Sequence, residues 1–326
     1  MQRRGVSICI LAASLAMTLA SPARAAQVND YPNKPIRIIV PFPPGGSNDL
    51  LGRYLGERLS DRLGAQIVID NRGGANGILG TQLAAETTPD GYTLLLVSVS
   101  YAMNAAVRKL PWNVEKSFDP IAMIGLNTNC LVVSPNGPYK TLKDIIAAAK
   151  AKPGALSYAS TGVGGFNHFG GELFNKLAGV SVVHVPYKGG APGMTDVMGG
   201  QIPMMFSSLT QTLPHVRSGR LKVIAVGSEK RQQVVPDVPT FVEAGLPGYE
   251  IYGWWGMSVP AGVPKAIQSK LAALFTQILQ EPATHKRLAA EAAEPQIMSP
   301  DALRSFIGAE VKKWTEVAKQ AGIRVN

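Results

Sequence analysis

Short apolar segments alternate with amphipathic segments from residue 36 onward. The segments 36–40, 66–70 and 92–100 are apolar and bounded by turn residues, and we predict them to be strands. Between them, 50–63 repeats leucine every fourth residue and 78–86 follows a glycine-rich turn, so both are predicted helices. Strands that alternate with helices predict right-handed βαβ units and an open parallel sheet.

The same alternation continues through the rest of the chain. Further strands are predicted at 118–133, 156–160, 182–187, 202–206 and 223–226. Further helices are predicted at 141–150, 264–279 and 300–320. Two more predicted helices begin at glycine-rich segments: one opens at 161–168 and ends at 177, and the other opens at 188–192. Ser299 and Gly322 have the residue types expected at the two ends of the last helix. Past Val226, prolines and glycines interrupt the pattern, which predicts an irregular return crossing between two domains.

Residues 1–25 have the pattern of a secretory signal peptide. Two arginines at 3–4 precede an apolar run at 6–20, and Ala23-Arg24-Ala25 places small residues at both positions of the cleavage motif. The apolar run is shorter than the roughly 20 residues of a membrane span. We therefore expect cleavage after Ala25 and export to the periplasm.

The composition of the exported chain limits its fold and its partners. Cleavage leaves 301 residues (326 − 25), more than one core usually fills, so we expect two domains. It removes Cys9 and leaves Cys130 alone, so no internal disulfide is expected. The formal charge of +10 falls to +7 with three arginines removed. No run of Lys or Arg exceeds two residues, so we expect anionic small molecules as partners and no nucleic acid.

The loop at 41–49, Pro-Phe-Pro-Pro-Gly-Gly-Ser-Asn-Asp, connects the first predicted strand to the first helix. A strand, a glycine pair and a helix start together offer free backbone N–H groups and a positive helix end to an anion. The segment 161–168 repeats this design, so two anion-binding loops are expected to face one another across a cleft. The alternative for either loop is a turn that binds no ligand.

Single residues in and near these loops have two possible roles. Asp49 either complements the helix dipole or, since its charge repels a carboxylate, orders the loop or a bridging water. His168, beside the second glycine cluster, is either structural or in contact with the ligand, and Asn104 is either a core residue or part of a site near the end of its strand. Arg72 could bind a carboxylate or lie in solvent, and the tryptophans at 254–255 could pack or stack on a ligand.

Motifs of common enzymes are absent from the sequence. It has no G-x-S-x-G, no H-E-x-x-H and no G-x-x-x-x-G-K-[ST], and its four histidines are scattered. The segment 162–167 approaches G-x-G-x-x-G but lacks the last glycine. These absences favour a binding protein over an enzyme, and we expect no cofactor and no metal site.

A series of ordered motifs covers nearly the whole exported chain. They are Tyr31-Pro32-x-Lys34-Pro35-Ile36-Arg37-x-Ile39-Val40-Pro41-Phe42, Gly45-Gly46-x-x-Asp49, Asn71-Arg72-x-Gly74-Ala75-x-Gly77-x-x-Gly80, Pro89-Asp90-Gly91-Tyr92-Thr93-Leu94, Ser160-Thr161-Gly162, His184-Val185-Pro186-Tyr187-Lys188-Gly189, Gly199-Gly200-Gln201-Ile202, Pro236-Asp237-Val238-Pro239-Thr240, Glu243-Ala244-Gly245-Leu246-Pro247-Gly248 and Pro260-Ala261-Gly262. In this order, the motifs resemble those of the Bug (TctC-like) periplasmic solute-binding proteins. The resemblance implies an α/β, type II periplasmic-binding-protein fold with two open-sheet domains and a ligand cleft between them. We expect domain 1 at 26–127 and 251–326 and domain 2 at 128–250.

The resemblance also implies which residues contact the ligand, partly through water. By position they are Phe42, Gly45, Gly46 and Asp49 in the first loop, Ser160, Thr161, Gly162, Gly164, Gly165 and His168 in the second, and Ser98, Asn104, Lys188 and Ser207 elsewhere in or near the cleft. The chain departs from the family at Ser207-Ser208, where an acidic or amide residue is common. We expect a changed preference at the far end of the ligand, in a direction that stays open.

The function implied is that of a monomeric extracytoplasmic receptor. It would bind a small carboxylate by domain closure and deliver it to the permease subunits of a tripartite tricarboxylate-type transporter. The alternative is a partner that presents its ligand to a membrane histidine kinase with the same fold and site, and a third class is an exported hydrolase. A dicarboxylate, an aromatic acid, an amino acid and a nicotinate-like compound all stay open as ligands.

Overall fold

The computed structural model of the chain describes residues 30–290 and 292–323. Residues 32–326 form one compact unit, whose described part is 32–290 and 292–323. The predicted signal peptide and its cleavage site lie outside the described residues. In the part of the chain that is described, no helix has the length and hydropathy that crossing a membrane requires.

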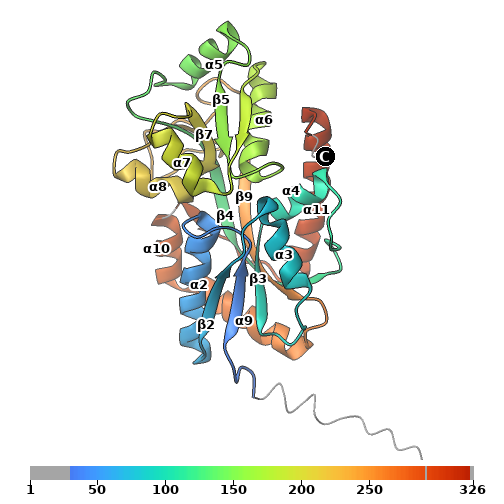
Figure 1. Cartoon of the computed structure of the whole chain (residues 1–326). Helices are drawn as coiled ribbons and strands as arrows, with labels where there is room; N and C mark the ends of the chain where they lie inside the picture. Colours follow the sequence, from blue (N-terminus) through green and yellow to red (C-terminus); the bar gives the residue numbers. More distant parts are fainter. Residues whose placement is uncertain (1–29, 291, 324–326) are drawn as a thin grey trace, which may run out of the picture. The chain divides into compact units, whose positions relative to one another are not determined.

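Strands and helices alternate along most of this unit (Figure 1). The strands are β1 (Ile36–Val40), β2 (Ile67–Asn71), β3 (Thr93–Ser98), β4 (Phe118–Val133), β5 (Ser157–Ser160), β6 (Val183–Pro186), β7 (Met204–Ser208), β8 (Lys222–Val226), β9 (Tyr252–Pro260) and β10 (Ala293–Pro295). The helices are α2 (Ser47–Leu63), the short 3-10 helix η1 (Ala75–Gly77), α3 (Ile78–Ala85), α4 (Val99–Val107), α5 (Leu142–Ala151), α6 (Phe166–Ala178), α7 (Gly190–Met198), α8 (Leu209–Arg217), α9 (Lys265–Gln280), α10 (Pro282–Ala290) and α11 (Pro300–Ala321).

The sheet contains two sets of parallel strands joined by an antiparallel centre. The strand order is β2-β1-β3-β9-β4-β7-β5-β6, and β8 and β10 also pair with β4. Within β1–β3 and within β5–β7 the neighbours are parallel, whereas β9 runs antiparallel to β3 and β4, and β7 runs antiparallel to β4. The open parallel sheet predicted from the first three strands is confirmed within β1–β3, and the sheet as a whole, which includes β4 and β9, is mixed.

This topology directs the carboxyl ends of both parallel sets toward the same stretch of β4. The β9 partners occupy Phe118–Thr128 of β4, and the β7 partners occupy Asn129–Val133. Ser98, at the end of β3, pairs with Trp255 of β9, and Ser208, at the end of β7, pairs with Asn129 of β4. In open α/β sheets ligands gather outside the carboxyl ends of strands. The polar stretch Asn127–Asn129 in an otherwise apolar strand lies where the two sets meet.

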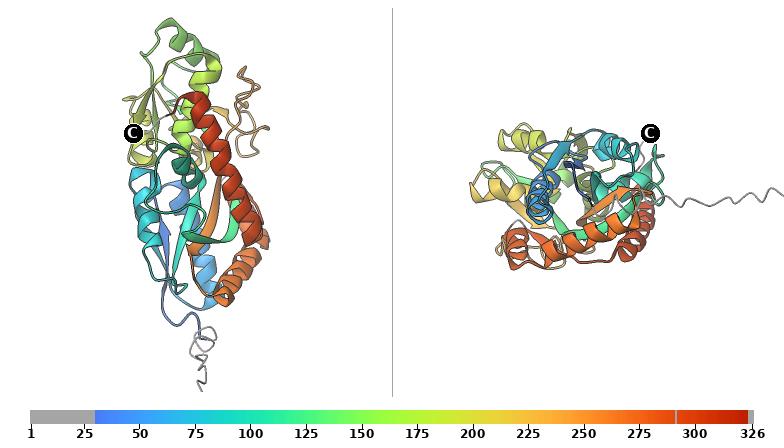
Figure 2. Two further views of the ribbon diagram at one scale, coloured as in Figure 1. Left: turned by 90° about the vertical axis from the view of Figure 1, so that its right-hand side faces the viewer. Right: turned by 90° about the horizontal axis from the view of Figure 1, so that it is seen from below.

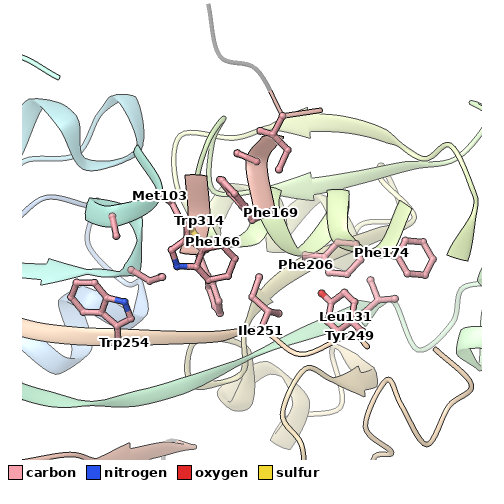
Figure 3. Close-up of a cluster of buried hydrophobic side chains, with 14 of the residues drawn as sticks. Met103, Leu131, Phe166, Phe169, Phe174, Phe206, Tyr249, Ile251, Trp254 and Trp314 are labelled. Carbon is pink, nitrogen blue, oxygen red and sulfur yellow. The ribbon is translucent and has the colours of Figure 1, made fainter. Parts of the chain in front are cut away.

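A buried hydrophobic cluster includes residues of both strand sets and of α4, α6 and α11, and Figure 3 shows part of it around Phe206, Trp254 and Trp314. Trp254 on β9 and Trp314 on α11 both donate their indole N–H to the Glu310 carboxylate, at 2.9 and 2.8 Å. Trp314 in turn packs edge-on against Phe169 of α6, with ring centroids 5.4 Å apart. Helix α11, the long red helix in Figure 2, thus connects the β9 region to α6. The predicted domain boundaries at 127/128 and 250/251 stay a prediction.

Most predicted elements are present, and several boundaries and elements differ. The predicted strand 92–100 ends at Ser98, because Val99 and Ser100 already belong to α4. Helix α2 begins at Ser47, three residues before the predicted start, so its first turn includes the loop residues. Strand β9, helices α4, α8 and α10 and strand β10 were not predicted. The return crossing is irregular from 227 to 251, as predicted.

Local signals at element ends agree with the sequence. Gly64 has φ +63° at the end of α2, and Gly322 has φ +68° at the end of α11. The Ser299 side chain accepts from the backbone N–H of Ala302, as an N-cap does. Thr141 and Asp144 form a capping box at the start of α5.

Candidate functional site

A pocket of about 60 Å³, here called the inner pocket, lies between the carboxyl ends of the two parallel strand sets. Its wall contains residues of the first predicted loop, among them Phe42 and Gly46, and of the second, Thr161. Ser98 and Asn127 line it from the centre of the sheet, beside the two tryptophans 254–255. The two glycine-rich loops thus border one cavity.

Five helices begin at the inner pocket. The lining residues at their starts are Ser47 and Asn48 of α2, Val99 and Ser100 of α4, Phe166 and Asn167 of α6, Gly190, Ala191 and Pro192 of α7, and Ser208 and Gln211 at the start of α8. The first turn of each helix has backbone N–H groups without an intrahelical acceptor, and its dipole is positive there. Five such ends around one small cavity produce a positive potential from backbone alone.

The lining of the inner pocket contains no ionisable side chain among the described residues. An anion in this cavity would therefore find no Lys or Arg to pair with and no Asp or Glu to repel it. Backbone N–H groups, hydroxyls and carboxamides are the available donors. Helix N-termini bind carboxylate and phosphate groups in this way without a cationic side chain.

The first loop is shaped by Asp49, which lies behind it and does not line the pocket. The backbone N–H of Gly45 donates to Asp49 Oδ2 at 2.8 Å, and Gly45 adopts φ +82°, a conformation that glycine favours. Arg53 pairs with Asp49 Oδ1 at 3.0 Å. Burial raises the pKa of Asp49, but the hydrogen bonds from Gly45, Arg53 and Asn71 outweigh it and lower the pKa below its ordinary value. The carboxylate is charged and is used to order the loop.

The second loop is shaped by a pair of stacked histidines. The backbone N–H of Gly164 donates to His168 Nδ1 at 3.1 Å, so this nitrogen carries no proton. The His168 ring lies on the His184 ring with centroids 4.0 Å apart, and His184 Nε2 is 2.6 Å from Ser160 Oγ. Burial lowers the pKa of His168 to about 4 and that of His184 to about 3, with the nearby Arg108 adding to the first and His168 to the second. Both rings are neutral at neutral pH.

Several buried polar atoms of the inner pocket have no hydrogen-bond partner in the protein. They are Asn48 Oδ1, Asn127 Oδ1, Ser208 Oγ and Gln211 Nε2. Asn127, Ser208 and Gln211 are only 6 %, 5 % and 5 % exposed. Buried polar groups are nearly always paired, because an unpaired one costs about 1–3 kcal/mol. The pocket is thus built to receive a polar molecule.

A second, wider hollow of about 780 Å³, here called the outer hollow, adjoins the inner pocket. The two share Phe42, Pro43, Pro44, Thr161 and Gly189 in their walls. The outer hollow contains the two cationic side chains that the inner pocket lacks, Arg108 and Lys188. These cations lie beside the inner pocket and not in its wall.

The residues predicted for the site fall into three groups. Phe42, Gly46, Ser98 and Thr161 line the inner pocket, whereas Gly162 and Lys188 line only the outer hollow. The other predicted residues line neither, namely Gly45, Asp49, Asn104, Ser160, Gly164, Gly165, His168 and Ser207. Of these, Asn104 is buried and exchanges hydrogen bonds with Asn76. Arg72 pairs with Asp70, at 2.8 Å, and is outside both walls.

The sequence reasoning missed several lining residues. Asn127 could have been found as a polar residue inside an apolar strand, and Gln211 as the residue one helical turn after Ser208. At the end of β7, Ser208 lines the pocket and Ser207 does not, because neighbouring strand residues point to opposite faces. Trp254 and Trp255 line the pocket as well as packing in the core.

Comparison with known proteins agrees with this architecture. Residues 51–323 match the tripartite tricarboxylate transporter family receptor, TctC. The chain is 35% identical over 320 residues to Protein BugT of Bordetella pertussis, covering 97% of this chain and 98% of that protein. It superimposes with a TM-score of 0.88 on an R. palustris protein solved with adipate, at 32% identity over 90% of this chain and 99% of the other. The TM-score is 0.83 with MatC from Rhodopseudomonas palustris, solved with bound malate, at 29% identity over 88% and 99%.

The likeness in sequence and fold covers nearly the whole described chain. It confirms the predicted α/β periplasmic-binding-protein fold and the predicted resemblance. The family and fold are those of solute-binding receptors rather than of enzymes. The chain belongs to the Bug (TctC-like) family of periplasmic tripartite tricarboxylate transporter receptors.

Proposed function

We propose that this receptor binds a small carboxylate in the inner pocket and delivers it to the permease subunits of a tripartite tricarboxylate-type transporter. In this proposal residues 1–25 export the chain to the periplasm. The two predicted domains close over the ligand, and the two loops, beginning at Phe42 and at Ser160, hold its carboxylate.

The observation that supports the proposal best is the convergence of five helix N-termini on an uncharged cavity. A cation would be repelled there, and a neutral sugar would leave the positive potential unused. A carboxylate has the charge and the acceptor oxygens that the N–H groups and hydroxyls require. The adipate and malate of the two R. palustris neighbours are consistent with this class.

The positions of the cationic residues also support the proposal. Arg108 and Lys188 lie in the outer hollow and not in the wall of the inner pocket. Positive charge at an entrance attracts an anion during its approach, and its attraction falls with ionic strength. Attraction at the entrance and binding by backbone groups inside are then separate steps.

A thermal-shift screen against a library of small carboxylates tests the proposal. A ligand that binds only the folded state raises the free energy of unfolding, by about 2.7 kcal/mol at a hundredfold excess over Kd, and the melting temperature rises with it. We expect at least one member to raise it, and amines and neutral sugars to leave it unchanged. If no carboxylate raises it, the proposal is wrong.

Gly46 offers a matched pair of variants for the same test. It is the N-cap of α2 and lines the inner pocket, and a Cβ there would meet only Pro43 O, at 3.8 Å. Gly46→Asp therefore places a carboxylate beside the ligand without steric conflict in the protein, and Gly46→Asn places the same volume without charge. We expect the Asp variant to lose carboxylate binding by calorimetry and the Asn variant to bind more tightly than the Asp variant. Equal affinities in the two would contradict a site for an anion here.

A further inference from the structure

We propose that the ligand of the inner pocket is a short dicarboxylate without an ammonium group, whose second carboxylate binds Ser208 and Gln211 at the start of α8. This inference rests on the proposed function and names the class of carboxylate. In this inference the far end of the ligand binds Ser208 and Gln211, which lie outside the two glycine-rich loops.

The topology of the second strand set gives the pocket two ends. The connection from β5 through α6 to β6 runs outward along the sheet, and the connection from β6 through α7 to β7 runs back. Right-handed crossovers in opposite directions place their helices on opposite faces of the sheet. Figure 1 shows α6 on one side of the upper strands and α7 and α8 on the other. The pocket therefore has one group of helix starts at α6 and another at α7 and α8.

The strand register gives the extent of the pocket along the sheet. Ser98 lies level with Trp255, which pairs with Gly125 of β4, whereas Ser208 lies level with Asn129 of β4. Four residues of a strand span about 13 Å at 3.3 Å per residue. Asn127 lies midway between these levels. Polar groups are thus placed at both ends of the pocket, where two carboxylates would lie, and Asn127 lies between them.

The far end contains donors that nothing in the protein uses. Ser208 Oγ and Gln211 Nε2 are buried, line the pocket and have no partner in the protein. The Gln211 amide lies against Gly190, the first residue of α7, where any Cβ would overlap it. A hydroxyl, an amide N–H and the first turns of α7 and α8 together form a site for an anion. A methyl or ring end would leave these donors unpaired, which is costly in a buried site.

In its described lining, the inner pocket has no carboxylate that could balance the charge of an ammonium, although Asn48 and Asn127 offer amide oxygens. No Asp, Glu or other ionisable side chain lines it in the described part of the chain. The nearest acid of the first loop, Asp49, is already bound by Gly45 and Arg53. An α-amino acid would place its ammonium among positive helix ends, so the pocket selects against amino acids.

The size of the inner pocket limits the length of the ligand. At about 60 Å³, the pocket is far smaller than the outer hollow of about 780 Å³. Among dicarboxylates, a short one such as succinate is therefore expected to fit within it. A longer dicarboxylate would have to extend through the shared wall at Phe42 and Thr161 into the outer hollow.

Calorimetry with four probes tests the inference on the exported chain. Butyrate has the chain length of succinate but one carboxylate, L-aspartate adds an ammonium, and adipate adds length. We expect succinate to bind more tightly than butyrate and L-aspartate, each by roughly tenfold or more, the range of a hydrogen bond to a charged group. We also expect it to bind more tightly than adipate. Butyrate, L-aspartate or adipate binding as tightly as succinate would overturn the inference.

Gln211→Glu is the most informative variant, because it changes charge at constant shape. The new carboxylate repels the second carboxylate of succinate and can pair with the ammonium of L-aspartate. We expect the preference between these two ligands to reverse. In Ser208→Ala, we expect the ratio of succinate to butyrate affinity to fall toward one. The control is Gln201→Glu, because Gln201 is exposed and does not line the pocket. In this variant, the affinity ratios of succinate to L-aspartate and of succinate to butyrate should equal those of the unmodified protein.

The outcomes separate this inference from the function on which it rests. If another carboxylate of the library raises the melting temperature and succinate does not bind, the inference is wrong and the receptor function stands. If no carboxylate binds, both are wrong. If succinate binds but its preference over L-aspartate is unchanged in Gln211→Glu, the second carboxylate lies elsewhere.

Discussion

At the scale of single residues, the site depends on buried side chains that never line the pocket. Asp49 holds the backbone of Gly45, and His168 holds that of Gly164. Each removes one N–H group from the set available to a ligand and in return fixes the path of its loop. A lone histidine beside a glycine cluster suggests ligand contact from sequence, because sequence does not show which way a ring points. In the structure the ring lies behind the loop.

The histidine pair makes stability depend on pH. In the unfolded chain both imidazoles titrate near pH 6.5, whereas burial lowers the pKa of His168 to about 4 and that of His184 to about 3 in the folded protein. Between these values the unfolded state binds more protons, so stability is full above about pH 6.5 and falls as the pH drops toward 4. We expect His168 alone to account for a loss on the order of 3 kcal/mol of unfolding free energy.

Urea unfolding at pH 7.5, 6 and 5 measures this dependence. The control is His168→Gln, which removes the titrating group and retains a side-chain oxygen able to accept from Gly164. Its unfolding free energy should fall less between pH 7.5 and 5 than that of the unmodified protein. An equal fall in both would show that other groups cause the acid sensitivity.

The predictable part of the site is the part carried by local motifs. Phe42, Gly46 and Thr161 line the pocket because a strand, a glycine turn and a helix start lie together in sequence. Asn127 and Gln211 also line it, but each becomes part of the site only through strand pairing with distant segments. Local patterns mark both as unusual positions, but they do not show that either side chain faces a ligand.

At the scale of elements, strand positions follow from apolar runs, whereas strand direction does not. Strands β1 and β5 were predicted because glycine or proline turns bound a short apolar run. Strand β9, Tyr-Gly-Trp-Trp-Gly-Met-Ser-Val-Pro, was missed because it is almost wholly buried and contains two glycines, so it shows neither alternation nor a β-branched run. Its antiparallel pairing with β3 and β4 joins the predicted parallel set to the rest of the sheet and makes the whole sheet mixed.

Packing of α3 against the first loop gives a prediction at this scale. Gly80 lies where a Cβ would overlap the Arg72 carbonyl and approach Pro41 Cα to 2.8 Å, and backbone atoms there cannot rotate away. We expect Gly80→Ala to lower the unfolding free energy by about 1–3 kcal/mol. Because the loop after β1 must move, carboxylate affinity should also fall.

The matched control is Gly308→Ala in α11, where the added methyl would lie more than 4 Å from every atom beyond its chain neighbours and the local helix backbone. Replacing glycine inside a helix should stabilise the protein, by about 0.5–1 kcal/mol. Urea unfolding and calorimetry measure both variants. A Gly80→Ala protein as stable as Gly308→Ala would show that α3 does not fix the loop by close packing.

At the scale of the whole described unit, contacts join the two parallel strand sets around the pocket. Arg108, which follows α4, donates to the Val163 carbonyl of the second loop at 3.0 Å. Gly165 lies so close to Asn76 that a Cβ would be 2.5 Å from its Oδ1, and Gly189 packs near Pro43 in the same way. If the two predicted domains open and close, these contacts exist only in the closed form. A ligand shifts such an equilibrium by its differential affinity for the two forms.

Arg108 allows this to be measured, because it lies outside the inner pocket. Losing its hydrogen bond to Val163 should weaken carboxylate binding in Arg108→Ala by roughly five- to tenfold, the effect of one hydrogen bond on the closed form. The neighbouring Lys109 is exposed, and Lys109→Ala removes the same charge. We expect Lys109→Ala to bind as the unmodified protein does. Equal affinities in the two variants would rule out a contribution of this contact to closure.

The uncharged wall of the inner pocket separates two tasks that most anion sites combine. In the proposed function, backbone N–H groups at the helix starts balance the charge of the ligand, and a single side-chain replacement leaves these groups in place. The remaining groups of the ligand are recognised by a few side chains, such as Asn127, Ser208 and Gln211. A receptor built this way can acquire a new ligand through two or three substitutions and still hold a carboxylate. The same scaffold is therefore suited to diversification by gene duplication, in which copies differ in what they transport and not in how they hold its charge.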